Sequence, residues 1–174
     1  FRIGTSASDS AYFAIGDLLA SAISKPPRSR SCEAGGSCGV PGLVAVAVST
    51  EGSQANIEAI AAGRLESGLA QSDITHWAYR GTGQFVGREK VKGISAIAGL
   101  YPEAVHIVVR KKSKIRSVKD LAGKRVSLGP ERTGTNSAAR AILQAHGVST
   151  RSLRLASDTA GRSGELMRKG QLDA

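Results

Sequence analysis

The amino-acid sequence predicts an α/β fold of two lobes, each built around a mainly parallel sheet. Two observations support this prediction. The spacing of apolar residues changes from strand-like to helix-like several times along the 174 residues. In addition, the run "LVAVAVS" at residues 43–49 is continuously apolar, which is typical of a strand buried on both faces of a parallel sheet. The 41% of hydrophobic residues is enough for a packed core.

Three strand–helix units are expected in the first half of the chain. "FRIGTS" is the first strand, and the helix after it begins near Ser8 and ends at Pro26-Pro27. Its apolar face is expected to contain Tyr12, Ile15, Leu18, Leu19, Ala22 and Ile23. The strand at 43–49 leads into a helix capped by Ser53 and stopped by Gly63. "SGLAQS" and "DITHWAYRG" repeat the strand–helix order.

The crossing between the lobes is expected at residues 101–110. There "ISAIAGL" and "AVHIVVR" are predicted to be two strands with no helix between them. We therefore place lobe 1 at residues 1–105 and lobe 2 at residues 106–174. In lobe 2, "KRVSLG" is a strand before an Ala-rich helix, and "LRLA" precedes a last helix up to Gly170. The final "QLDA" has the pattern of a strand start, so we expect lobe 2 to be truncated.

The net charge of +10 is concentrated at residues 110–125, which hold eight basic residues and the single acidic Asp120. Three interpretations stay open: a solvated surface around a short helix capped by Ser117, a field that attracts anions or an acidic partner, and nucleic-acid binding. The last is the least favoured, because aromatic residues make up 4% of the chain and no DNA- or RNA-binding motif is present. No apolar run has transmembrane length. No signal peptide is visible, which fits a cytosolic protein or a processed secreted one.

Cys32 and Cys38 are the two cysteines, in a loop at residues 26–42 rich in Pro, Gly and Ser. Two thiols cannot form a structural zinc site, and the spacing is not that of a C-x-x-C redox motif. A disulfide is the simplest use and would indicate an oxidising compartment. Two separate buried thiols are the alternative.

"GPERTGTNSAARAIL" at residues 129–143 has the G-x-x-x-x-G spacing of a phosphate-binding loop, but Thr135 stands where the lysine should be. A polyphosphate site is therefore excluded. Small hydroxyl or amide residues occur at this and three other strand–helix junctions: Thr5-Ser6, Gly52-Ser53 with Asn56, Gln71-Ser72-Asp73 and Thr133-Gly134-Thr135. Helix caps explain each junction singly, whereas all four together predict an uncharged anion site suited to a carboxylate.

Catalytic and metal sites find no support in the sequence. His76, His106 and His146 lie far apart without metal-ligand spacing, and there is no G-x-S-x-G motif. We therefore expect a binding protein with no catalytic residues, no metal and no cofactor. The competing hypotheses are an effector-sensing module of a transcription regulator and an enzyme on the same fold.

The segments "FRIGTSASDSAYFAIG", "TEGSQANIEAIAAGRLESGLAQSDITHWAYRG", "LYPEAVHIVVR" and "VKDLAGKRVSLGPERTGTNSAARAIL" resemble the TAXI-type solute-binding subunits of TRAP transporters. The "CEAGGSCGVPGL" insertion resembles a subgroup of that family. The resemblance implies a type II periplasmic binding-protein fold and a periplasmic receptor. Such a receptor binds a small carboxylate or amino acid between its lobes and delivers it to membrane permease subunits. It also supports the disulfide and accounts for the missing signal peptide.

The same resemblance implies which residues contact the ligand. They are Thr5, Ser6, Ser53, Asn56, Gln71, Ser72 and Asp73 from lobe 1, and Thr133, Gly134 and Thr135 from lobe 2, with Tyr12 or Tyr101 as a wall. The first junction departs from the family's glycine-rich pattern, since it has Ala7, Ser8, Asp9 and Ser10. Asp9 is expected to cap a helix or to bind a ligand ammonium group.

Overall fold

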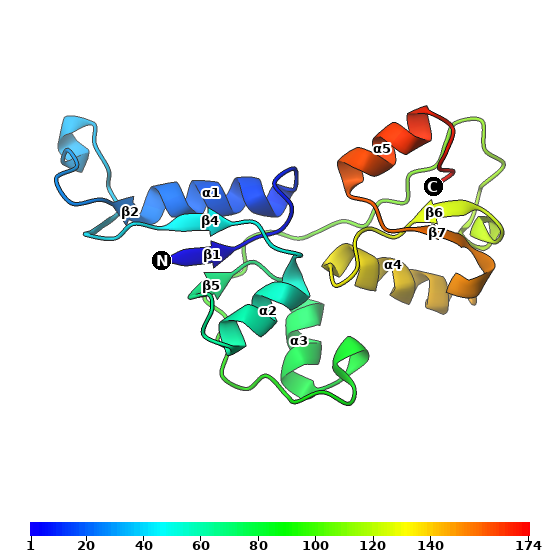
Figure 1. Cartoon of the computed structure of the whole chain (residues 1–174), viewed down its shortest axis with the longest axis horizontal. Helices are drawn as coiled ribbons and strands as arrows, with labels where there is room; N and C mark the ends of the chain where they lie inside the picture. The colour runs from blue at the N-terminus through cyan, green and yellow to red at the C-terminus, as the bar shows by residue number, and fades with distance from the viewer. The chain divides into compact units, whose positions relative to one another are not determined.

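The computed structural model describes all residues, 1–174, and divides them into two compact units, Phe1–Ser95 and Ala96–Ala174 (Figure 1). Each unit has its own parallel sheet and its own apolar core. The α/β fold with parallel strands is therefore confirmed. No helix combines the length and the apolar character that crossing a membrane requires.

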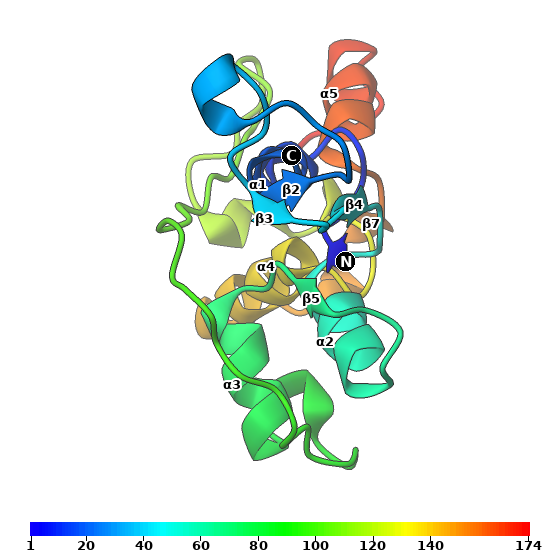
Figure 2. The same cartoon turned by 90° about the vertical axis from the view of Figure 1, so that its left-hand side faces the viewer.

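The sheet of unit 1 has three short parallel strands in the order β4-β1-β5. Its strands are β1 (Arg2–Gly4), β4 (Val46–Val48) and β5 (Ser67–Gly68). The helices of this unit are α1 (Ala11–Ile23), α2 (Ser53–Ala61) and α3 (Ser72–Arg80). Figure 2 shows α1 and α2 on opposite sides of the sheet. Because the strands are parallel, all three end at the same edge, where α1, α2 and α3 begin.

Two apolar clusters hold these elements. One packs α1 on the sheet through Ile3, Ala20 and Ala45. The other packs α2 on α3 and on the short helix η2 (Gly83–Phe85), through Ile57, Ile74, Ala78 and Phe85. Of the apolar face predicted for α1, Leu19 and Ile23 pack against the first cluster, whereas α2 and α3 pack on each other.

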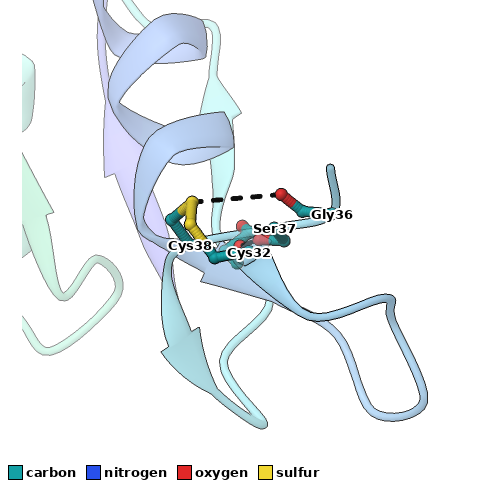
Figure 3. Close-up of a disulfide and its surroundings, with 5 residues drawn as sticks. Cys32, Gly36, Ser37 and Cys38 are labelled. Carbon is teal, nitrogen blue, oxygen red and sulfur yellow. Dashed lines mark hydrogen bonds between the residues drawn. A yellow bond between two sulfur atoms is a disulfide. The ribbon is translucent and has the colours of Figure 1, made fainter. Parts of the chain in front are cut away.

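The cysteine loop is closed by a Cys32–Cys38 disulfide, with the two Cα atoms 4.7 Å apart (Figure 3), which confirms the predicted pairing. The loop contains the short helix η1 (Cys32–Ala34) and lies between β2 (Ser24–Lys25) and β3 (Val40–Pro41), which pair in parallel. The Ser37 hydroxyl also donates a hydrogen bond to the carbonyl of Ser24. The disulfide therefore closes the loop on itself, and the β2–β3 pairing and the Ser37–Ser24 hydrogen bond fix it to the end of α1.

Unit 2 contains two paired parallel strands, β6 (Arg125–Ser127) and β7 (Arg154–Ala156). Each strand leads to a helix, α4 (Gly134–Ala145) or α5 (Ala160–Arg168), and the short helices η3 (Val118–Leu121) and η4 (Thr150–Ser152) precede the strands. The core consists of Ile115, Leu121, Val126, Leu128, Leu143, Val148 and Leu153. Residue 173 lies beside β6, where the Asp173 N–H donates to the carbonyl of Arg125 (2.8 Å).

Four sequence predictions about these elements are wrong. Residues 94–100 and 104–110 form no strand, because a single backbone hydrogen bond, from the Arg110 N–H to the carbonyl of Asp173, links them to another segment. The strand at residues 43–49 is shorter than predicted and is not buried on both faces, since β4 is an edge strand and Val46 is 47% exposed. Leu18 is 69% exposed, because α1 packs through the smaller Gly16 and Ala20.

The fourth concerns the helix caps. Gly52, not Ser53, is the N-cap of α2, and Ser10, not Asp9, caps α1 through its hydroxyl. The caps predicted at Thr133 and Ser117 are confirmed. Thr133 accepts from the N–H of Asn136, and Ser117 forms a capping box with Asp120.

Candidate functional site

The strand ends of unit 1 bring together most of the residues predicted for lobe 1. Thr5 and Ser6 follow β1, Ser53 and Asn56 lie in the first turns of α2 after β4, and Gln71 directly precedes α3 after β5. Thr5, Ser53 and Asn56 are at most 1% exposed. Their polar atoms therefore need partners inside the protein or in a bound ligand.

The Asn56 side chain joins the ends of all three strands. Its amide nitrogen donates to the carbonyl of Thr5, after β1, at 2.8 Å and to that of Leu69, after β5, at 2.7 Å. Its oxygen accepts from the hydroxyl of Thr50, after β4, at 2.7 Å. The Asn56 side chain packs tightly against Gly4, since a Cβ atom added to Gly4 would lie 2.5 Å from the Asn56 side-chain oxygen. Asn56 therefore sets the geometry of this edge.

The loop between β4 and α2 depends on Thr50 and Gly52. The Gly52 N–H donates to the Thr50 hydroxyl at 3.0 Å. Gly52 has φ 104 and ψ −154, a conformation that glycine adopts and other residues rarely do. This backbone turns the chain so that α2 begins directly at the strand ends.

The first turns of α2 and α3 present backbone N–H groups at this edge. The Ser53 hydroxyl accepts from the N–H of Gln71 at 3.2 Å, which ties the start of α3 to the start of α2. The N–H groups of Ser53, Gln54 and Ala55 in α2, and of Ser72 and Asp73 in α3, donate to no protein acceptor. Unpaired N–H groups at the positive end of a helix dipole favour an anion.

The remaining predicted residues of lobe 1 differ in exposure. Ser72 and Asp73 are exposed, and the Asp73 carboxylate accepts from the N–H of Ile74 at 2.8 Å. Ser6 and Tyr12 are half-buried. Ser6 is engaged through its carbonyl, which accepts from the Ser49 hydroxyl at 2.9 Å. Asp73 is the one charged group among the predicted ligand contacts.

Unit 2 has a similar turn after β6. Gly129, with φ +81, starts it, and the Thr133 hydroxyl donates to the carbonyl of Pro130 at 2.7 Å. The Asn136 amide donates to the carbonyl of Gly129 at 3.0 Å and so closes the turn. The N–H groups of Gly134 and Thr135 at the start of α4 donate to no protein acceptor. Thr135 is exposed, whereas Thr133 and Gly134 are buried.

Tyr101 lies apart from both turns in sequence, in the irregular stretch before unit 2's core, and is 41% exposed. Partial burial raises the pKa of its hydroxyl above the usual value, and the charge of Glu103 adds to the effect.

Apart from Tyr101, the groups whose pKa values are clearly shifted lie outside the candidate site. Hydrogen bonds from Arg2 lower the pKa of Glu66 to about 2, and those from Arg125 lower the pKa of Asp173 to about 2. His, Cys, Asp and Glu side chains do not gather in groups of three or more. The arrangement at the strand ends thus offers uncharged hydrogen-bond donors for an anion.

Sequence reasoning missed Thr50 and Asn136 as parts of these turns. Gly52 was named at the second junction, but the positive-φ backbone conformation that it adopts there was not predicted. Thr50 and Asn136 had no signal that separates them from other polar loop residues. Their importance comes from carbonyls and hydroxyls that the fold brings within hydrogen-bond distance.

Two comparisons relate the chain to known proteins. The model of the NMT1-like family matches residues 3–174. Among solved structures, the chain is similar to the alkanesulfonate-binding protein SsuA from Xanthomonas axonopodis pv. citri bound to MOPS, with 19% sequence identity and a TM-score of 0.57. The match covers 99% of this chain and 52% of the other, so the chain spans about half the length of that protein. The fold is that of a periplasmic binding protein over this length.

Proposed function

The chain belongs to the NMT1-like family, and we propose that it is a periplasmic solute receptor that binds a small carboxylate or amino acid. In this proposal it is a TAXI-type subunit and delivers its ligand to the membrane permease of a TRAP transporter. Lobe 1 (residues 1–105) and lobe 2 (residues 106–174) each contribute ligand contacts.

The observation that carries the proposal is the set of unpaired N–H groups at the starts of α2, α3 and α4. Hydrogen bonds from N–H groups to a charged acceptor are stronger than those to a neutral one. No lysine or arginine lies in the first turns of α2, α3 or α4. A carboxylate is therefore held without a buried ion pair, which allows the ligand to be released.

The candidate residues take two roles in this proposal. Ser53, Ser72, Asp73, Gly134 and Thr135 contact the ligand through backbone N–H groups or hydroxyls. Thr5, Ser6, Asn56, Gln71 and Thr133 hold the loops that carry those groups, and Tyr12 or Tyr101 forms a wall beside the ligand. Asp73 binds the ammonium group if the ligand is an amino acid.

The disulfide favours this function over a sensor module of a cytosolic transcription regulator, because such bonds persist in oxidising compartments. An enzyme on the same fold would need a nucleophile or an acid–base pair at the strand ends. The candidate residues there are neutral except for Asp73, whose carboxylate is exposed and bonded to its own helix.

Calorimetry on the protein expressed from its own gene tests the ligand class. We expect dicarboxylates or acidic amino acids to bind and nucleoside phosphates not to bind. Alkanesulfonates are the informative competitor, because the similar structure is an alkanesulfonate-binding protein. Preference for a sulfonate would overturn the carboxylate assignment, and turnover of any bound compound would overturn the receptor function.

Ser72 allows a backbone N–H to be tested directly. It is the first residue of α3, where proline is tolerated, and Gln71 before it has φ −67 and ψ 143, which proline permits. Ser72→Pro is expected to weaken carboxylate binding by roughly 10- to 100-fold, the value of one hydrogen bond to a charged group. Ser72→Ala is the matched control, because it keeps the N–H and removes the hydroxyl. Equal affinity of Ser72→Pro and wild type would exclude this N–H as a ligand donor.

A further inference from the structure

Almost all of the net charge belongs to unit 2. Residues 96–174 contain 15 Lys and Arg and 6 Asp and Glu, a net +9, whereas residues 1–95 contain 9 and 8, a net +1. The even distribution expected of a solvated surface is therefore absent. The basic residues of unit 2 therefore form a local excess of positive charge.

The backbone contacts gather basic residues at the edge where the strands of unit 2 begin. The Gly123 N–H donates to the carbonyl of Ser152 (2.6 Å), and the Arg154 N–H donates to that of Lys124 (2.8 Å). The Arg110 N–H donates to the carbonyl of Asp173 (3.2 Å), next to Arg125. We call nine basic residues of these segments and of the end of α5 the polybasic edge, which leaves out Arg110, Arg116 and Arg125: Lys111, Lys112, Lys114, Lys119, Lys124, Arg151, Arg154, Arg168 and Lys169.

The end of α5 lies at the same edge. Gly170, which follows α5, is so close to Arg110 that a Cβ atom added to it would lie 3.0 Å from the guanidinium group. Eight of the nine side chains are exposed, and Lys124 is half-buried. None of the nine forms an ion pair in the described residues 1–174.

The acidic residues at this edge are already engaged. The Asp120 carboxylate accepts from the N–H groups of Arg116 (2.9 Å) and Ser117 (2.8 Å). Asp173 pairs with Arg125 at 2.6 Å. Neither acid forms an ion pair with a member of the polybasic edge, so positive charge stays in large excess there.

The polybasic edge lies away from the candidate anion turn. β6 and β7 are parallel, so the edge where they begin is opposite the edge where Gly129 and Thr133 follow β6. Figure 1 shows the start of α4 at one end of this unit and the loops before β6 at the other. A large partner can therefore occupy the polybasic edge and leave the ligand turn free.

We propose that the polybasic edge binds the anionic headgroups of a lipid bilayer. Six of its nine residues are lysines, which are depleted at protein–protein interfaces but suit the hydrated surface of an anionic membrane. Tyr101 is the single aromatic residue of unit 2, so the base-stacking platforms of single-stranded nucleic-acid binders are missing. Clusters of four to eight Lys and Arg beside a membrane indicate binding to anionic lipid headgroups.

Vesicle flotation with the protein expressed from its own gene tests this proposal, in the absence of any solute ligand. We expect binding to vesicles of phosphatidylcholine mixed with phosphatidylglycerol, no binding to phosphatidylcholine alone, and loss of binding in about 1 M salt, where charges are screened within about 3 Å. Binding to both kinds of vesicle, or to neither, overturns the proposal. Because no solute is present, the result is independent of the ligand class assigned above.

A charge-matched pair of variants locates the surface. Lys111→Gln, Lys112→Gln and Lys114→Gln together are expected to weaken vesicle binding on the order of a hundredfold, since each basic residue contributes similarly near an anionic membrane. Arg30→Gln, Arg64→Gln and Lys90→Gln, exposed residues of unit 1, remove the same charge and are expected to leave binding nearly unchanged. Equal losses in both variants overturn the assignment to this edge. Binding to an acidic protein or to DNA without binding to vesicles overturns the choice of lipid.

Discussion

The buried side-chain amide of Asn56 holds the loops of the candidate site in place. Its side chain is fully buried, and its nitrogen and oxygen bond to groups that follow β1, β4 and β5. The sequence predicts Asn56 as a ligand contact, and the structure gives it the additional role of a positioning residue. The two roles have different consequences for stability.

Asn56→Ala is expected to destabilise the protein by about 2–4 kcal/mol, because the carbonyl of Leu69 loses its partner and Thr5 and Thr50 each lose one hydrogen bond. Denaturant unfolding measures the change. Thr135→Val is the comparison, since Thr135 is exposed and its replacement is expected to change stability by less than about 0.5 kcal/mol. Normal stability of Asn56→Ala together with lost ligand binding would show a direct contact only.

Asp173 is expected to make the stability of unit 2 depend on acid pH. Hydrogen bonds from Arg125 lower its pKa from 3.8 to about 2. The unfolded chain thus takes up a proton at higher pH than the folded one, so this contribution is complete above about pH 4 and is lost as the pH falls toward about 2. Thermal unfolding of Asp173→Asn should show a smaller loss of stability in this range than wild type. Identical pH profiles would contradict the ion pair.

At the scale of elements, the packing of α1 depends on a glycine. Gly16 faces Thr5, and a Cβ on Gly16 would lie 2.3 Å from the Thr5 methyl group. Gly16→Ala is therefore expected to cost about 1–3 kcal/mol by overpacking. Gly164→Ala in α5 meets no atom within 4 Å and is expected to stabilise its helix by up to about 1 kcal/mol. Chemical denaturation should show a lower free energy of unfolding for Gly16→Ala and a higher one for Gly164→Ala. A change of the same sign in both variants would contradict the tight packing of α1 at Gly16.

The disulfide of the cysteine loop is expected to contribute little to the stability of the protein. The disulfide closes a loop of residues only six positions apart, so the chain-entropy model gives about 2 kcal/mol. The β2–β3 pairing keeps the loop attached when the bond is removed. Cys32→Ser with Cys38→Ser is expected to lower the melting temperature by several degrees without abolishing folding. Loss of the folded state would show that the disulfide is essential.

Helix ends that are determined by residues nearby in the sequence could be predicted. Strands and their burial, which depend on segments distant in the sequence, could not. Thr133 and Gly63 mark a helix start and a helix end through chemistry within a few residues, and both are confirmed. The exposure of β4 depends on its place at the edge of the sheet, which the apolar run does not encode. Likewise, residues 104–110 have the composition of a strand, but strands require a paired neighbour.

The same distinction applies to the candidate site. Ser, Thr and Gly at strand ends indicated where an anion could bind, because parallel strands place their carboxyl ends at one edge. The Ser53–Gln71 and Asn56–Leu69 hydrogen bonds join residues 18 and 13 positions apart, and no local pattern predicts them. The position of the site could therefore be predicted, but its supporting network could not.

At the scale of the whole molecule, the two units differ in charge and have separate cores. Residues 89–109 carry no helix or strand. Lys90 and Lys92 are exposed in this irregular stretch, and Lys111 and Lys112 lie in an exposed turn just after it. Irregular exposed backbone adapts to a protease active site more readily than helices and strands do.

Limited digestion with trypsin is accordingly expected to cut first at Lys90, Lys92, Lys111 or Lys112 and to give two resistant fragments that correspond to the two units. Most other basic residues are protected by their place in helices, strands or ion pairs; for example, Arg125 lies in β6 and pairs with Asp173. Mass spectrometry of the early fragments identifies the cuts. The exposed Arg140 within α4 is the internal comparison, since cleavage there requires unfolding of the helix. Early cleavage at Arg140, or uniform digestion, would show that unit 2 is not an independently stable core.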